Sequence, residues 1–163
     1  MVVGEESVEK LHQHYRLATV IGYGMIGSLL VLAAVVETLK AIPYESPGFF
    51  SSSTLDLLRY LFFGIAVIEF FLIRFIRKMI LSRGNGTRLL SREGDLVSGK
   101  AQKLFSATVV SFAFCESVAI YGLVLFILGG SSLDFYLFIF LSLGFFWFYF
   151  PRYPQWEKWV NAN

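Results

Sequence analysis

The sequence has little of the chemistry that metal and redox sites require, with one cysteine and two histidines in 163 residues. A lone Cys115 excludes an intramolecular disulfide, and no Cys/His cluster of zinc-site spacing and no CxxCH haem motif occurs. His12 and His14 are two residues apart and do not share a face of a helix. We interpret both as solvated or interfacial, with a metal or haem role as the weaker alternative. The sequence therefore predicts no metal site and no cofactor.

The apolar parts of the sequence also lack period-two alternation, which excludes a transmembrane β-barrel. Instead, the 56% hydrophobic residues are concentrated in four continuous blocks, at residues 17–39, 57–76, 104–128 and 133–150. Each block is close to the ~20 residues with which a helix crosses a ~30 Å hydrocarbon layer, and a helix satisfies its own backbone polar groups there. The sequence predicts an all-α, polytopic membrane protein, a single membrane domain over residues 1–163 with four transmembrane helices.

Lysine and arginine are absent from two of the connecting segments, residues 41–53 and 129–132. The middle connection, a predicted loop over residues 78–103, and its flank are strongly basic by contrast. With four spans this loop and both termini share one side, which the positive-inside rule makes cytoplasmic. We expect a multi-pass protein of the cytoplasmic (inner) membrane. The eight basic residues of this region are Arg74, Arg77, Lys78, Arg83, Arg88, Arg92, Lys100 and Lys103.

The basic residues beside the membrane have two interpretations. Arg77, Lys78, Arg83 and Arg88 bind anionic lipid headgroups, or they serve only to fix the topology. No nucleic-acid-binding motif accompanies these charges, so we predict no nucleic-acid partner.

Three of the four apolar blocks contain a glutamate. Glu37 lies near the outer end of its block, with Lys40 one turn later as a partner, and we interpret it as structural. Glu69 and Glu116 each lie twelve residues inside their blocks, about 18 Å deep at ~1.5 Å per residue. Since sequential helices are usually antiparallel neighbours, we expect these two carboxyl groups to face each other near the midplane.

A charge at this depth costs at least ~2.5–3.5 kcal/mol on insertion scales. The nearest cations along the same block, Arg59 and Arg74, lie ten residues outward and five residues inward of Glu69. We therefore predict that Glu116 and Glu69 are neutral acids at pH 7 and bind a transported proton. The alternative is an interhelical hydrogen bond, which contributes only about 0.6 kcal/mol on average in membranes.

Small residues in the first and third blocks predict close packing between two helices. We expect the face of the first block to meet the face of the third. The residues concerned are Gly22, Gly24, Gly27 and Ser28 in the first block and Ser106, Ala113, Ser117 and Gly122 in the third.

Residues 94–128, GDLVSGKAQKLFSATVVSFAFCESVAIYGLVLFIL, resemble the polar loop and carboxylate helix of the rotary ATP synthase subunit c. The closest part is the run from Glu116 to Val124, ESVAIYGLV. The length and the four-span plan also resemble the duplicated V-type proteolipid. The resemblance implies that Glu116 binds the transported proton or sodium ion.

Two functions remain open from the sequence. One is a small proton-handling membrane subunit, similar to subunit c, with Glu116 as the carrier. The other is a non-transporting accessory or assembly subunit of a larger membrane complex, because the loops are short and no catalytic constellation occurs. No His-rich, Ser/His or Asp/Glu motif lies at an interface, so we predict that the protein is not an enzyme. In either case its partners are the lipid bilayer and other membrane subunits or further copies of itself.

Overall fold

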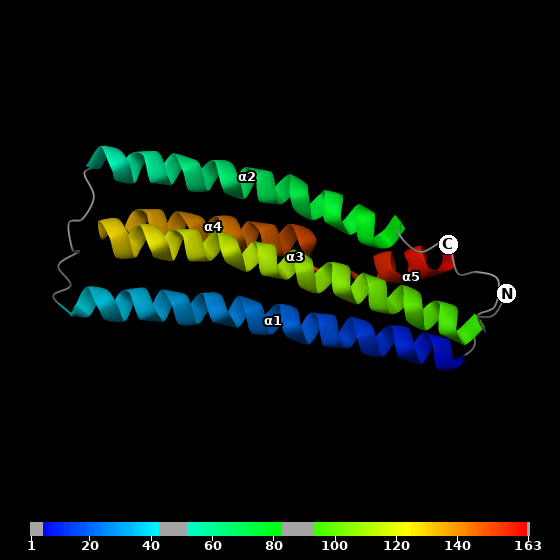
Figure 1. Cartoon of the computed structure of the whole chain (residues 1–163). Coiled ribbons are helices and arrows are strands. Elements are labelled where there is room, and N and C mark those ends of the chain that lie inside the picture. Colours follow the sequence, from blue (N-terminus) through cyan, green and yellow to red (C-terminus); the bar gives the residue numbers. More distant parts are fainter. Residues whose placement is uncertain (1–4, 43–51, 83–92, 163) are drawn as a thin grey trace.

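The structure is a computed structural model that describes residues 5–42, 52–82 and 93–162. In these ranges it contains five helices and no strand. Three of the helices, α1, α3 and α4, are long and apolar enough to cross a membrane, as in a multi-pass membrane protein (Figure 1). The helices are α1 (Glu5–Ala41), α2 (Ser52–Ser82), α3 (Glu93–Gly129), α4 (Ser132–Tyr149) and α5 (Tyr153–Ala162).

The predicted span at residues 57–76 belongs to α2, whose composition differs from that of the other long helices. Every stretch of 18 residues in α2 contains at least three charged residues, which sets it apart from α1, α3 and α4. Nevertheless α2 carries a row of large apolar side chains that the rest of the chain leaves more than half exposed. These are Leu57, Tyr60, Leu61, Val67, Ile68, Phe71 and Phe75.

The helices extend beyond the predicted membrane blocks at one end of the bundle. Residues 78–82 and 93–103, which we expected within a loop, are helical. Hydropathy marks where a helix leaves lipid, whereas the helix itself continues through residues such as lysine and glutamine that favour it in water. Three of the basic residues that we expected in this loop, Arg83, Arg88 and Arg92, lie outside the described residues.

The start of α1, the end of α2, the start of α3 and all of α5 lie together, at what we name the basic end (Figure 1). The opposite end, with the α3–α4 connection, is named the turn end. The short helix α5 was not predicted from the sequence, in which Pro151 and Pro154 indicate only that the preceding helix stops. Pro154 is the second residue of α5, and the first turn is where a helix tolerates proline.

The helix α5 closes the basic end by burying an indole. Trp156 is only 2% exposed and packs in a small apolar cluster on α1 and α3. Tyr15 of α1 meets its ring edge-on, with ring centroids 5.6 Å apart. The buried members of the cluster are Leu11, Ala18, Ala101, Leu104 and Trp156.

The connection at the turn end is formed by a glycine and a serine. Gly130 has a φ of 69°, the left-handed conformation that commonly terminates a helix at glycine. Its backbone N–H donates to the carbonyl of Phe126 at 2.7 Å. The next residue, Ser131, is the N-cap of α4 and accepts a hydrogen bond from the backbone N–H of Asp134. This tight connection brings α4 back antiparallel to α3.

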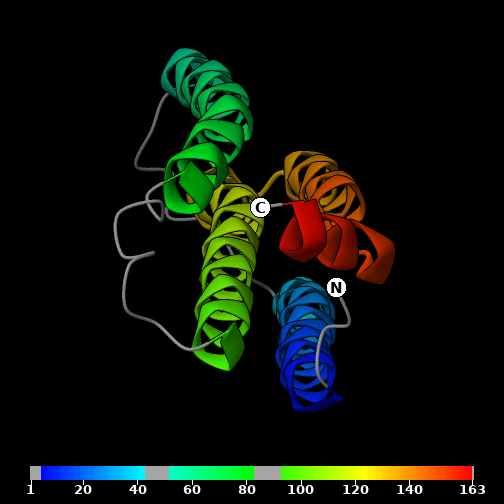
Figure 2. The same cartoon turned by 90° about the vertical axis from the view of Figure 1, so that its right-hand side faces the viewer.

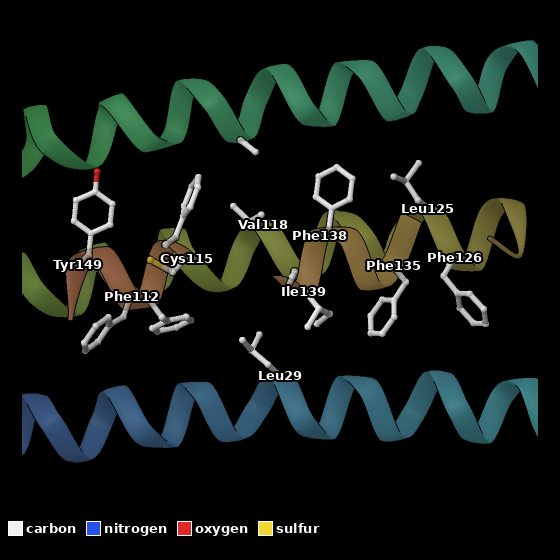
Figure 3. Close-up of a cluster of buried hydrophobic side chains, with 14 of the residues drawn as sticks. Leu29, Phe112, Cys115, Val118, Leu125, Phe126, Phe135, Phe138, Ile139 and Tyr149 are labelled. Atoms are coloured by element: carbon white, nitrogen blue, oxygen red, sulfur yellow. The ribbon is translucent and has the colours of Figure 1, made fainter. Parts of the chain in front are cut away.

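The central element of the bundle is α3, which packs against α1, α2 and α4 (Figure 2). The main apolar core lies along it. Side chains of α3 and α4, among them Phe112, Val118 and Phe138, fill the space between α1 and α2 (Figure 3). Because α3 is central, its polar residues can form contacts with several neighbouring helices.

Candidate functional site

The carboxyl group of Glu69 is buried between α2 and α3, with the residue only 7% exposed. The hydroxyl of Tyr121 donates to its Oε1 at 2.6 Å. The hydroxyl of Ser117 lies 3.2 Å from both carboxyl oxygens. Ser117 and Tyr121 are four residues apart, on one face of α3. Two hydroxyl groups of α3 therefore bind the one acidic side chain in the middle of α2.

The carboxyl group of Glu116 lies on a different side of α3 and contacts α1. The hydroxyl of Ser28 is 2.5 Å from its Oε1, and the residue is only partly buried. The same hydroxyl is 2.6 Å from the backbone carbonyl oxygen of Met25. Ser28 has one hydrogen, so it donates to only one of these two oxygens at a time.

The two glutamates do not face each other as we expected. Glu116 contacts Ser28 of α1, whereas Glu69 contacts Ser117 and Tyr121 of α3. We expected them to do so because they lie at a similar depth along their helices. Depth does not determine the direction in which a side chain points around the helix axis. Successive residues of a helix point about 100° apart, since a turn has 3.6 residues. Thus Glu116 and the adjacent Ser117 are directed to different neighbours.

Two further polar contacts join α4 to α3 and to α2 near the same level. The hydroxyl of Ser142 on α4 donates to the backbone carbonyl of Cys115 at 2.6 Å. The hydroxyl of Tyr149 on α4 donates to the carbonyl of Phe70, next to Glu69, at 2.8 Å (Figure 3). Together with the two glutamates, these contacts form a layer of hydrogen bonds that links all four long helices. We name it the polar layer.

Among the described residues, no cation forms an ion pair with Glu69 or Glu116, and the cation nearest the polar layer is Arg77, beside the ring of Tyr149. The described ion pairs lie toward the turn end: Arg59 with Asp134 and Asp56, and Lys40 with Glu37. Only hydroxyl groups contact Glu69 and Glu116.

One of the ion pairs at the turn end, Arg59 with Asp134, joins α2 to α4, and the other two lie within single helices. Arg59 Nη2 lies 2.7 Å from Asp134 Oδ2, and Arg59 Nη1 lies 3.0 Å from Asp56 Oδ1. The expected pair of Glu37 and Lys40 is confirmed, with Lys40 Nζ 2.9 Å from Glu37 Oε1.

Two residues at the turn end, Asp134 and Tyr136, were not predicted from the sequence. Asp134 holds Arg59, and the hydroxyl of Tyr136 on α4 also donates to Glu37. The Ser131-x-x-Asp134 spacing, a capping pattern, was a signal that could have placed Asp134 at the start of a helix.

The predicted packing residues divide among three helix contacts. Gly22 faces α3, since a Cβ built on it would lie 2.9 Å from the ring of Phe112. Ser28 also faces α3 through Glu116. Ser117 instead faces α2 through Glu69. Gly122 faces α4, where a Cβ would lie 2.7 Å from that of Phe138.

The remaining predicted packing residues do not lie at a helix contact. A Cβ at Gly24 or Gly27 would meet nothing within 4 Å, and Ser106 and Ala113 are exposed. The expectation that two continuous small-residue faces meet is therefore wrong. The contact between α1 and α3 is formed by Gly22 and Ser28 together with larger apolar side chains such as Leu29.

Two of the four predicted headgroup residues can be placed. Lys78 is exposed, and Arg77 is partly buried, with its guanidinium 5.9 Å from the centroid of the Tyr149 ring. The other two, Arg83 and Arg88, lie outside the described residues.

Comparisons with known proteins give no relative. No protein-family model, no curated protein and no solved structure matches the chain. The resemblance of residues 94–128 to subunit c therefore stays a prediction from those residues. Within residues 5–42, 52–82 and 93–162, no three His, Cys, Asp or Glu side chains are grouped so as to hold a metal ion.

Proposed function

We propose that the chain is a four-span protein of the cytoplasmic membrane in which α2 is the fourth spanning helix. Its 31 residues give a length of about 46 Å at ~1.5 Å per residue, more than the ~30 Å hydrocarbon layer. The charges of α2 have partners or lie near an end: Arg59 pairs with Asp134, and Glu69 accepts hydroxyl groups. The basic end then faces the cytoplasm, in line with the positive-inside rule.

We propose further that this membrane protein handles protons through Glu116. The carrying observation is the hydroxyl of Ser28, which lies between two oxygens at 2.5 and 2.6 Å. With Glu116 protonated, its O–H donates to Ser28 while Ser28 donates to the carbonyl of Met25. With Glu116 ionised, Ser28 turns its hydrogen to the carboxylate. Both protonation states are thus hydrogen-bonded with no movement of heavy atoms, as a proton carrier requires.

Burial distinguishes Glu116 from Glu69. Glu116 is partly exposed at the surface of the chain, so a proton donor or acceptor can reach it. Glu69 is sealed between α2 and α3, with Tyr121 and Ser117 as its partners. We assign proton exchange to Glu116 and the attachment of α2 to Glu69. The predicted ion-binding role of Glu69 is therefore not part of the proposal.

A second candidate is supported by the same contacts, namely a non-transporting accessory or assembly subunit. Interhelical hydrogen bonds account for both carboxyl groups, since each has a hydroxyl partner on a neighbouring helix. In that case the polar layer only holds the bundle together. The uncovered apolar face of α2 would then contact another subunit as well as lipid.

Labelling with a hydrophobic carbodiimide, which modifies protonated carboxyl groups in lipid, separates the two candidates. We expect modification of Glu116 at pH 7, located by mass spectrometry, that decreases as the pH rises. Glu69→Gln should keep this labelling and Glu116→Gln should abolish it. The absence of modification at pH 7 in the folded protein would refute proton handling. Purification in mild detergent with native mass measurement then identifies a ring of copies or a partner subunit.

A further inference from the structure

Two adjoining cavities at the basic end of α4 lie beside the polar layer, and Tyr149 belongs to both the layer and the lining of one cavity. They share three lining residues, Trp147, Phe150 and Arg152. The first cavity has a volume of about 450 Å³ and lies between α2 and the α4–α5 connection. The second has a volume of about 420 Å³ and lies between α1 and α4. Because Arg152 lines both, a single molecule can occupy the two together.

The first cavity is basic. Arg74, Arg77 and Arg152 line it together with Gln155, and no carboxylate is among its lining residues. None of the three arginines forms an ion pair with a carboxylate of the described residues. The planar guanidinium group suits phosphate, because it presents several N–H donors in a fixed fork. The chemistry of this cavity therefore fits a phosphate group.

The second cavity is apolar. Apart from Arg152, its walls are aromatic and aliphatic side chains of α1 and α4, and Trp147 at its edge is 81% exposed. Such a groove on the outside of a membrane bundle suits a hydrocarbon chain. The remaining wall residues are Tyr23, Ile26, Leu143, Phe146 and Phe150.

We propose that the two cavities bind one anionic phospholipid. Its phosphate lies among Arg74, Arg77 and Arg152, and one acyl chain lies in the groove between α1 and α4. A free phosphate would occupy only the basic cavity. A phospholipid would occupy both cavities, because Arg152 lines the basic cavity as well as the apolar one. Basic residues near the cytoplasmic surface attract anionic lipids. The proposal needs only a bilayer setting and is independent of proton handling at Glu116.

Native mass spectrometry of the full chain in detergent tests the headgroup part. The probes are phosphatidylglycerol and phosphatidylcholine with the same acyl chains. We expect tighter binding of phosphatidylglycerol, and Arg152→Gln should weaken it about fivefold, the effect of one basic residue near a membrane surface. Lys158→Gln is the matched control, since Lys158 is exposed on α5 and lines neither cavity. Equal binding of the two lipids, or an equal effect of the two variants, would overturn the proposal.

Filling the groove tests the acyl-chain part. Ile26→Trp should weaken phosphatidylglycerol binding, and Leu143→Trp on the opposite wall should do the same. Circular dichroism checks that both variants keep the helix content of the parent. Inorganic phosphate at millimolar concentration should compete poorly with the lipid. If inorganic phosphate displaces the lipid readily and both tryptophan variants bind as the parent does, the site is an anion site and the lipid proposal is wrong.

Discussion

The contact between α3 and α4 at Gly122 gives a prediction whose size follows from the structure. A Cβ at Gly122 would lie 2.7 Å from the Cβ of Phe138 and 3.0 Å from the carbonyl oxygen of Phe135. Neither atom can rotate away, because one is fixed to the backbone and the other belongs to it. Non-bonded carbon atoms lie ~3.5–4.0 Å apart, so Gly122→Ala must separate the helices by about 1 Å. Overpacking of this kind costs about 1–3 kcal/mol.

The matched control is Gly144→Ala in α4, where a Cβ would meet nothing within 4 Å. In both variants alanine stabilises the helix relative to glycine by about 0.5–1 kcal/mol. The free energy of unfolding should therefore fall for Gly122→Ala, rise slightly for Gly144→Ala, and differ between them by the overpacking cost. The assay is equilibrium unfolding by dodecyl sulfate in mixed micelles, followed by circular dichroism. Equal stability of the two variants would refute the close approach of α3 and α4.

Two further predictions concern the hydroxyl and ionic partners of the acidic side chains. Tyr121→Phe removes the 2.6 Å hydrogen bond to Glu69. The free energy of unfolding should fall by about 0.6–1.7 kcal/mol, the range measured for such bonds in membranes. An unchanged free energy of unfolding in the same micelle assay would show that the bond contributes nothing to stability. Arg59→Gln leaves the buried carboxylate of Asp134 without its cation, and we expect a loss of about 1.5–3 kcal/mol. Asp56→Asn is the control, since this exposed partner of the same arginine should contribute at most about 1 kcal/mol. An equal loss of stability in both variants would contradict the greater contribution of the buried Arg59–Asp134 pair.

The apolar blocks were enough to place the long helices, but not to give their lengths. Continuous apolar runs identify α1, α3 and α4 as candidate spans, because lipid selects for composition along the whole width. The polar first turns of α1 and α3 carry no such signal, so the start of the apolar block does not mark the start of either helix. The helix α5 depends on the burial of Trp156 against α1 and α3, a tertiary contact that a local reading of Pro151 and Pro154 cannot reveal.

The sequence predicted that Glu69 and Glu116 lie at a similar depth, but not which neighbouring helix each side chain faces. Counting residues placed Glu69 and Glu116 at a similar level, and the structure joins both to the polar layer. Which neighbour each carboxyl group contacts depends on how α3 is turned, and this is set by the packing of phenylalanines such as Phe112 and Phe138. The i, i+4 spacing of Ser117 and Tyr121 was a usable signal for two donors on one face of α3.

The protonation state of Glu116 tests the account most directly, and infrared spectroscopy of the full chain in lipid measures it. The carbonyl stretch of protonated carboxyl groups should be present at pH 7, with one component that vanishes in Glu116→Gln and persists in Glu69→Gln. Ser28→Ala should shift the frequency of this band, because the hydroxyl bonded to the carboxyl group is removed. A spectrum at pH 7 without any Glu116-dependent carboxyl band would show that this side chain is ionised and would contradict the proposed carrier.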